Sequence, residues 1–199
     1  MSKIVRQRVV REVQFVCPRC GLDRAGRQVS RRRWWQLAGI PLVPVAAAEP
    51  GVVCRVCEHR YDLDVLDIPT TADLSSVLED ATVACVVTIL RATAVDAHAE
   101  IGRRAIDMLE RNAYAYDDDR LAHAVSTVSA DEARRRIARL RHELTPYGKQ
   151  GLLHRLTDIV MPGATIAASH RDALVDIGRS LGLGGAHVHG LLAVATVDA

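Results

Sequence analysis

Aromatic side chains are scarce in this 199-residue chain, where they make up 4% of the residues and include a single phenylalanine. Alanine, valine and leucine carry most of the 49% hydrophobic content, which favours helices in most of the chain. No apolar run is long enough to cross a bilayer, because Pro41 and Pro44 interrupt the longest candidate, residues 34–48. The first residues also lack the apolar stretch of a secretory signal. We therefore expect no membrane span and a cytoplasmic location.

Recognisable catalytic motifs are missing as well. No serine, cysteine or aspartate lies near a histidine in a nucleophile motif. The glycines near the C-terminus do not form a phosphate-binding loop. We therefore expect a protein that is not an enzyme and that has no small-molecule substrate.

Charge is distributed unevenly along the chain. Residues 1–60 contain 12 Lys and Arg against 4 Asp and Glu, a balance of +8. Residues 61–199 contain 14 against 20, a balance of −6, and the two balances sum to the net charge of +2. A basic segment followed by an acidic one indicates two parts with different partners, or parts that contact each other.

Two Cys-x-x-Cys pairs are the strongest chemical signal. Two thiolates three positions apart reach one ion only if the backbone turns sharply, and a distant second pair then completes a tetrahedron. We predict one structural Zn²⁺ as the cofactor, with no coordination place left for a substrate. The alternatives are a redox dithiol, disulfides, or His59 in place of one thiolate. The predicted ligands are Cys17, Cys20, Cys54 and Cys57.

Strand patterns precede helix patterns, and we place a domain boundary between them, giving domains 1–68 and 69–199. Valines around residues 9–16 suit a short strand, and residues 61–65 alternate like another. Apolar residues then follow helical spacing in seven segments, the last of them at about 186–194. The expected helix starts are Thr70 or Thr71, Asp96, Asp117–Asp119, Ser129, Thr145–Pro146 and Ser169, and Gly182 is expected to end the sixth helix.

The segment between the cysteine pairs carries a family resemblance. Residues 32–45, Arg-Arg-Trp-Trp-Gln-Leu-Ala-Gly-Ile-Pro-Leu-Val-Pro-Val, resemble the Arg/Lys-Trp-Phe…Ile-Pro-Leu-Ile-Pro segment of a bacterial zinc-ribbon family, and the flanking cysteines occupy the matching places. The resemblance covers residues 14–66. It implies a zinc ribbon with at least one tryptophan in its small core. Glu58 stands where that family usually has glycine.

The helical part is similar to a second family. Residues 152–192, with Asp158-Ile159-Val160 and the stretch from Leu174 to Leu183, look like a TerB-like domain, the all-helical fold of tellurite-resistance proteins. The resemblance implies a small β zinc ribbon followed by an all-α, TerB-like helical bundle. Acidic loop residues of that family are thought to bind divalent cations. Here Asp96 remains, whereas Arg103, Gly163 and His170 stand at the other acidic positions. We therefore do not expect the divalent-cation site of that family in this chain.

Residues 31–35, three arginines followed by two tryptophans, are the most suggestive feature outside the metal site. The arginines suit phosphates and the indoles suit stacking on bases, whereas an apolar surface from Trp34 to Leu42 suits a protein partner. The remaining interpretation places the tryptophans in the ribbon core with solvated arginines. The candidate interaction residues are Arg31, Arg32, Arg33, Trp34 and Trp35.

The functional hypothesis is a non-enzymatic zinc-binding adaptor that connects a protein partner to an assembly or stress system. The alternative is a nucleic-acid- or ribosome-associated factor that uses residues 31–35. A second arginine cluster, residues 134–141, is expected to be a solvated helix face. His187 and His189 are two residues apart on a helix, so we expect them not to share an ion. Lone Cys85 is expected to be a buried hydrophobe.

Overall fold

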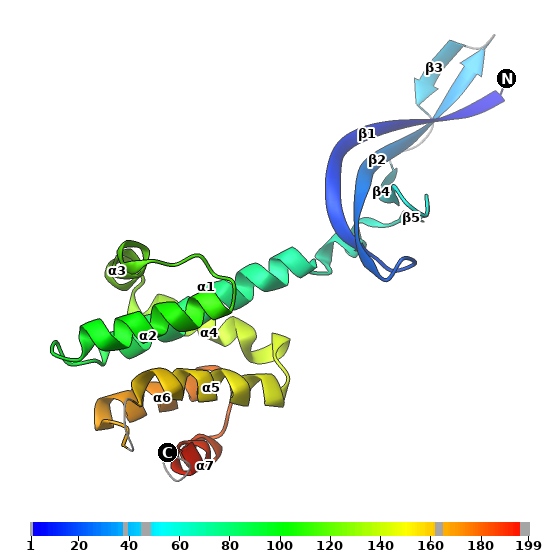
Figure 1. The fold of residues 1–199 in the computed structure, drawn as a ribbon. Helices are drawn as coiled ribbons and strands as arrows, with labels where there is room; N and C mark the ends of the chain where they lie inside the picture. Colours follow the sequence, from blue (N-terminus) through cyan, green and yellow to red (C-terminus); the bar gives the residue numbers. More distant parts are fainter. Residues whose placement is uncertain (1, 38–39, 45–48, 162–164, 196–199) are drawn as a thin grey trace. The chain divides into compact units, whose positions relative to one another are not determined.

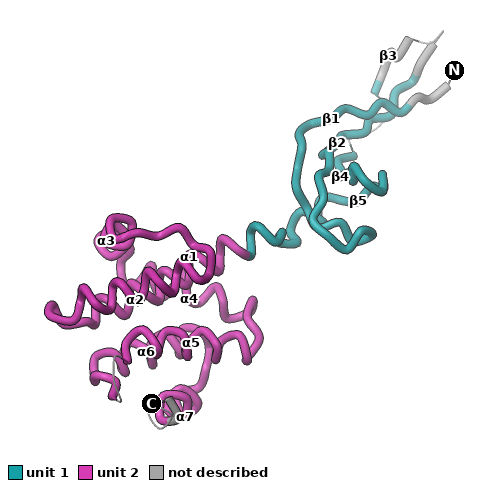
Figure 2. Tube along the Cα trace, in the orientation of Figure 1, with its two compact units in different colours: residues 1–74 teal, residues 75–199 magenta. Residues whose placement is uncertain are grey.

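The structure is a computed structural model that describes residues 2–37, 40–44, 49–161 and 165–195, with the backbone alone at 2–4, 36–37, 40–43 and 194–195. An antiparallel β region precedes a helical region, which confirms the expected order of β and then α (Figure 1). The chain forms two compact units, residues 1–74 and 75–199 (Figure 2).

The first unit is built on a long antiparallel hairpin. Strand β1 (Ser2–Cys17) pairs with β2 (Leu22–Leu37) along its whole length, and the register shifts between Val9 and Arg11. The other edge of β2 pairs with β3 (Ile40–Pro44) near Trp34 and with β4 (Glu49–Cys54) between Gly26 and Arg31. The last strand, β5 (Arg60–Tyr61), pairs with β4.

Both strand predictions needed correction. The strand expected at residues 9–16 extends back to Ser2, because its partner β2 offers backbone groups along the full length of the hairpin. The strand expected at residues 61–65 is wrong beyond Tyr61, where a 3₁₀ helix, η1 (Leu63–Asp67), follows. Leu63 and Leu66 are three positions apart and eclipse in a 3₁₀ helix, so both pack against the core together with Val65.

The core of the first unit is small. Its main cluster consists of Phe15, Val52 and Val65 together with two of the cysteines, Tyr61 packs against it, and Val29 is also buried. The Phe15 ring needs the space above Gly26, since a Cβ at Gly26 would lie 2.6 Å from its Cε1 atom. So few buried side chains stabilise a fold of this size poorly on their own.

Seven α-helices occur in the described part of the second region. The first, α1, crosses the boundary between the two units, and residues 81–87, 89 and 90 of it are all buried, as expected for a helix covered on every side. The bounds are α1 (Thr71–Arg91), α2 (His98–Arg111), α3 (Asp118–Thr127), α4 (Ala130–Glu143), α5 (Pro146–Val160), α6 (Ala168–Ser180) and α7 (Gly185–Ala195).

Most of the expected helix ends are confirmed. Thr70 caps α1 through reciprocal hydrogen bonds with Asp73, and Asp117, Ser129 and Thr145 accept backbone N–H groups at the starts of α3, α4 and α5. Gly182 ends α6 with a φ of 79°.

Two of the expected helix starts are wrong. Helix α2 begins at His98 after Ala97, and exposed Asp96 lies in the preceding turn. Backbone hydrogen bonds from Ala97 to Ala94 and from His98 to Val95 lead directly into the helix without a side-chain cap. Helix α6 begins at Ala168, also without a side-chain cap and one residue before Ser169.

Candidate metal centre

Two backbone turns of the same kind present the cysteine pairs. Cys17 ends β1 and Cys54 ends β4, and each strand turns back sharply. The N–H of Gly21 donates to the carbonyl of Cys17 at 2.8 Å, and the N–H of Glu58 donates to the carbonyl of Cys54 at 3.1 Å. Both donors have positive φ, 69° at Gly21 and 55° at Glu58. Glu58 therefore adopts the backbone conformation that glycine provides in the first turn.

The two turns bring four sulfur atoms together. The Sγ atoms of Cys17, Cys20, Cys54 and Cys57 all lie within 4.8 Å of one another. Cys17 and Cys57 are 3.6 Å apart, close to the edge of about 3.8 Å expected for a tetrahedron with zinc–sulfur bonds of about 2.3 Å. This is the only cluster of three or more potential ligands from His, Cys, Asp and Glu among the described residues. The four predicted ligand residues can therefore hold one metal ion.

Two alternatives for the cysteines, disulfides and a histidine ligand, receive no support from the geometry. All five cysteines are free thiols, so neither pair forms a disulfide. His59 is exposed and lies edge-on to the ring of Tyr61, with ring centroids 4.8 Å apart, rather than in the sulfur cluster. Cys85 is fully buried in the helical core, and burial raises its pKa, as expected for an inert thiol.

The local environment favours a thiolate at Cys17. Burial alone would raise the pKa of this thiol, but hydrogen bonds from Tyr61, from the backbone at Cys20 and from neighbouring thiols lower it to about 6. Burial and the adjacent sulfur atoms raise the pKa of Cys20 to about 11. Four thiolates without a cation would repel one another, and a bound dication removes that repulsion.

Tyr61 contacts the sulfur cluster, which the sequence alone did not indicate. Its hydroxyl oxygen lies 3.4 Å from the Cys17 sulfur and accepts the backbone N–H of Arg19 at 3.2 Å. Because the oxygen already accepts this N–H, its own proton is free to donate to the sulfur. The ring also packs edge-on against Phe15, with centroids 6.0 Å apart. Tyr61 thus connects the sulfur cluster to the small core, and its place soon after the second cysteine pair is the only sequence signal for this role.

The expected interaction residues do not form a single surface. They are consecutive on β2, so their side chains alternate between the two faces of the hairpin. Arg31, Arg33 and Trp35 share one face, whereas Arg32 and Trp34 share the other. Arg31 donates to the side chain of Gln7 at 2.8 Å, and Arg33 lies 3.8 Å from a carboxylate oxygen of Glu49.

The expectation of a tryptophan in the ribbon core is wrong. Trp34 is half-buried, Trp35 is 46% exposed, and neither belongs to the core cluster around Phe15. The side chains of Leu37, Ile40 and Leu42, which the sequence assigned to a docking surface, lie outside the described side chains.

Two further arginines join Arg32 on its face of the hairpin. Arg6 lies directly opposite Arg32 in the strand register, and Arg8 follows two positions along β1. All three are exposed, and none makes a hydrogen bond or ion pair with another residue that the structure describes. Like charges directly opposite one another destabilise a strand pair. The sequence signal was the spacing of two between Arg6 and Arg8, which places both on one face.

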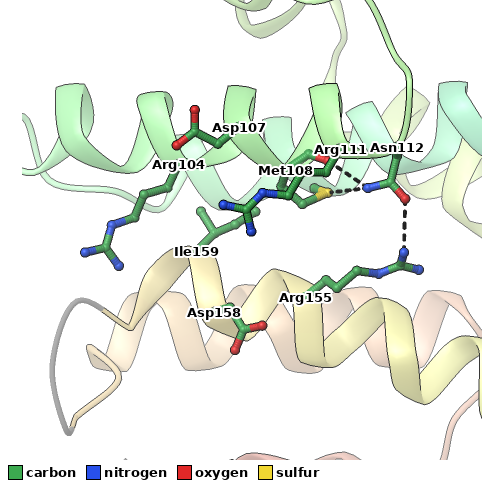
Figure 3. Close-up of a pocket in the computed structure, with 8 residues that line it drawn as sticks. All are labelled: Arg104, Asp107, Met108, Arg111, Asn112, Arg155, Asp158 and Ile159. Atoms are coloured by element: carbon green, nitrogen blue, oxygen red, sulfur yellow. Dashed lines mark hydrogen bonds between the residues drawn. The ribbon is translucent and has the colours of Figure 1, made fainter.

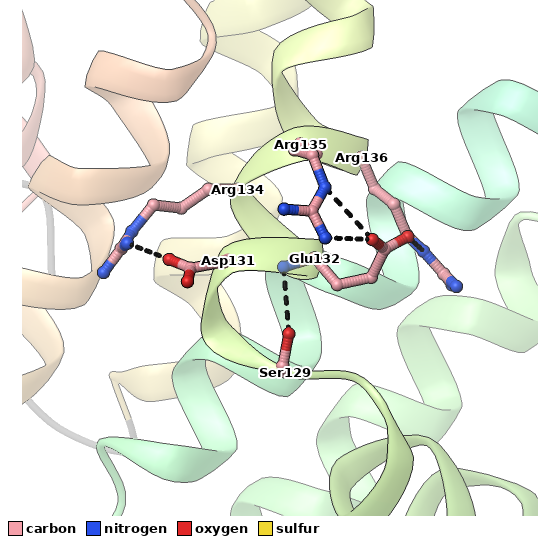
Figure 4. Close-up of polar contacts among 6 residues, drawn as sticks. All are labelled: Ser129, Asp131, Glu132, Arg134, Arg135 and Arg136. Carbon is pink, nitrogen blue, oxygen red and sulfur yellow. Dashed lines mark hydrogen bonds and ion pairs between the residues drawn. The ribbon is translucent and has the colours of Figure 1, made fainter.

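Three of the five arginines of α4 pair with acidic residues of the same helix, in agreement with the predicted solvated face. Arg134 pairs with Asp131 at 2.7 Å, and Arg135 and Arg136 both pair with Glu132, at 2.7 and 2.9 Å (Figure 4). These pairs connect residues three or four positions apart on one helix. These ion pairs therefore compensate part of the charge of this cluster.

The remaining candidates for metal binding do not gather ligands in the described part of the chain. Exposed His187 hydrogen-bonds to Gln150 at 2.9 Å, and His189 is exposed two residues later. Asp96 belongs to no group of three or more potential ligands among the described residues, and Gly163 lies outside them. None of the helices in the described ranges is both long and apolar enough to cross a membrane.

Comparison of the chain with protein-family models, with curated proteins and with solved structures found no match.

Proposed function

We propose that this protein is a non-enzymatic nucleic-acid-binding protein whose basic hairpin is supported by a structural zinc ion. The observation that carries the proposal is the cluster of Arg6, Arg8 and Arg32 on one face of the hairpin, which makes no ion pair with the residues that the structure describes. The layout of a cysteine-bearing β unit followed by helices is compatible with a zinc ribbon and a TerB-like bundle, and we propose these two family assignments as well.

The donor set favours zinc. Four cysteine sulfurs suit a soft-to-borderline cation that accepts tetrahedral geometry, and hard cations prefer oxygen. Cys17 and Cys54 are fully buried, and the four sulfurs would fill a tetrahedral ion completely. The ion would therefore hold the two turns together and would leave no open position for a substrate or water.

Zinc would contribute directly to the folding of the first unit, because that unit has a small core. Removing zinc with a chelator should abolish the order of residues 1–74 while the helical circular dichroism of the second unit remains. The measurement is circular dichroism together with limited proteolysis before and after chelation. Loss of the helical signal on chelation would contradict the independence of the two units.

The basic face suits single-stranded nucleic acid. Guanidinium groups pair with phosphates, and an indole on the same face can stack on a base. Trp34 shares the face of Arg32 and Arg6, which places a stacking surface beside phosphate-binding groups. A bound backbone would also relieve the repulsion between the two directly opposed arginines.

Anisotropy measurements with a labelled single-stranded oligonucleotide test this function. Affinity should fall steeply between about 50 mM and about 200 mM salt, and Arg32→Gln should weaken binding and reduce the salt slope by about 1. The matched control is Arg27→Gln on the same strand, because Arg27 is exposed on the other face and lies opposite Glu12. Equal binding by wild type and Arg32→Gln would contradict the proposal.

A protein adaptor is the second candidate. Val5 and Val9 are 55% and 47% exposed, and they lie on the same hairpin face as exposed Trp35. An apolar face of this kind supports a protein partner. A pull-down from nuclease-treated lysate distinguishes the two functions, because an adaptor should retain its partner after nuclease and lose it in Trp35→Ala. A partner that disappears with nuclease treatment supports nucleic-acid binding instead.

A further inference from the structure

A cavity of about 320 Å³ lies between α2 and α5 in the helical unit (Figure 3). Arg104 and Arg111 come from α2, Arg155 comes from α5, and the side chains of Met108 and Ile159 supply apolar lining. The volume is at the lower end of the range of about 300–1,000 Å³ that is typical of small-molecule clefts. All of its lining residues belong to the second unit, and none is a cysteine ligand or a hairpin arginine.

One guanidinium at the cavity is held in place by a chain of hydrogen bonds. Arg155 donates from Nη1 to the side-chain oxygen of Asn112 at 3.0 Å. The amide nitrogen of Asn112 donates in turn to the backbone oxygen of Met108 at 2.7 Å. These hydrogen bonds orient Arg155. An arginine has five N–H donors, so most of them remain available for a ligand.

A second guanidinium has no competing partner in the described part of the chain. Arg111 makes no hydrogen bond or ion pair with any residue in the described ranges, whereas Arg104 already pairs with Glu100 at 2.9 Å. Arg111 and Arg155 thus line one cavity from two different helices, and neither has a carboxylate within ion-pair distance among the described residues. Two such groups suit the oxygens of a phosphate, which guanidinium groups bind with paired N–H donors.

The cavity also contains acceptors, which narrow the choice of ligand. Asp107 and Asp158 line it together with the three arginines, so the lining groups have a net charge of +1. A carboxylate there opposes a bare anion but can accept hydrogen bonds from hydroxyl groups. The apolar surfaces of Met108 and Ile159 can contact carbon atoms between these polar groups.

We propose that this cavity binds the phosphate monoester of a small polyhydroxylated molecule. Arg111 and Arg155 contact the phosphate, Asp158 accepts hydrogen bonds from the hydroxyls, and the carbon skeleton lies against Met108 and Ile159. No covalent step is involved. The site is independent of the hairpin, so its occupancy does not require the nucleic-acid function proposed above.

Calorimetric titration of the zinc-loaded full chain tests the site with glucose 6-phosphate, inorganic phosphate and glucose as probes. We expect saturable binding in the order ester, then phosphate, then glucose. Arg111→Gln should weaken binding of the ester about tenfold or more, because it removes charge-assisted hydrogen bonds. The matched control is Arg103→Gln, an exposed arginine of α2 that does not line the cavity. Equal weakening by the two variants, or no saturable binding, would overturn the proposal.

A second variant separates the ester from phosphate alone. Asp158→Asn should tighten binding of inorganic phosphate, because it removes a negative charge from the cavity, and it should reduce the preference for the ester. An unchanged preference would overturn the role given to Asp158. A single-stranded oligonucleotide is the final probe: if it competes with the ester and its binding is lost in Arg111→Gln, the cavity contacts nucleic-acid phosphates and the monoester assignment is wrong.

Discussion

The two metal-binding turns differ at one position, and this difference allows a reciprocal test. Gly21 and Glu58 both have positive φ and both donate the hydrogen bond that closes their turn. A left-handed conformation costs a residue with a side chain about 1–2 kcal/mol. Glycine avoids this cost but loses about 0.4–1 kcal/mol more conformational entropy on folding. Replacing Glu58 with glycine should therefore stabilise the turn by roughly 0.5–1 kcal/mol, as the difference between these terms.

The opposite change should have the opposite sign. A Cβ at Gly21 meets no atom within 4 Å, so Gly21→Ala adds backbone strain without a steric clash. We expect it to destabilise the first turn by a similar amount, roughly 0.5–1 kcal/mol. Because zinc binding and folding of this unit are coupled, these energies should appear as two- to fivefold changes in apparent zinc affinity, roughly tenfold for each 1.4 kcal/mol.

Competition with a chromophoric zinc chelator measures both variants. Glu58→Gly should retain zinc at a higher chelator concentration than the wild type, and Gly21→Ala should lose it at a lower one. Gly151→Ala in α5 is the control, since its Cβ also meets no atom within 4 Å and it lies in the helical unit. The reasoning fails if Gly21→Ala binds zinc as tightly as the wild type, or if Glu58→Gly binds it more weakly.

Two further predictions concern Tyr61 and His170. Tyr61→Phe should weaken zinc binding about tenfold with the fold intact, because it removes the hydroxyl beside Cys17 but keeps the ring; unchanged affinity in the chelator assay would argue against this role. Burial lowers the pKa of His170, so the unfolded chain binds its proton at higher pH than the folded protein does. The free energy of unfolding should therefore fall as pH decreases below about 6.5. Urea titrations at several pH values should give His170→Gln a shallower pH dependence than the wild type, and equal slopes would contradict the prediction.

The chemistry at His170 explains why it should resist protonation. Thr93 donates its only hydroxyl proton to the backbone oxygen of Ile89 at 2.9 Å, so it can only accept from Nε2 of His170, also at 2.9 Å. The other ring nitrogen, Nδ1, is buried and has no partner among the described residues. A proton added there would create a buried donor without an acceptor.

Local features of this fold could be predicted from the sequence because they depend on neighbouring residues. The spacing of Cys17 and Cys20, and of Cys54 and Cys57, already implies two turns that face one ion. Helix starts at Ser129 and Thr145 were also predictable, since a cap needs only a side chain and an N–H three positions later.

Features that depend on distant residues could not be predicted in the same way. The extension of β1 back to Ser2 depends on its partner strand, because half of the hairpin residues are polar and show no clear core pattern. The contact between Tyr61 and Cys17 requires closure of a loop 44 residues long. Arg31–Trp35 are divided between two faces because this segment is a strand, and it is a strand because it pairs with the distant residues 3–7 of β1.

Metal analysis of freshly purified protein tests the central claim most directly. The account predicts one zinc ion per chain and its loss in Cys17→Ser or Cys54→Ser, because both sulfurs belong to the buried cluster. The measurement is zinc by elemental mass spectrometry together with protein concentration on the same sample. Protein that is folded and free of tightly held zinc, or cysteine variants that keep a full zinc ion, would contradict the account.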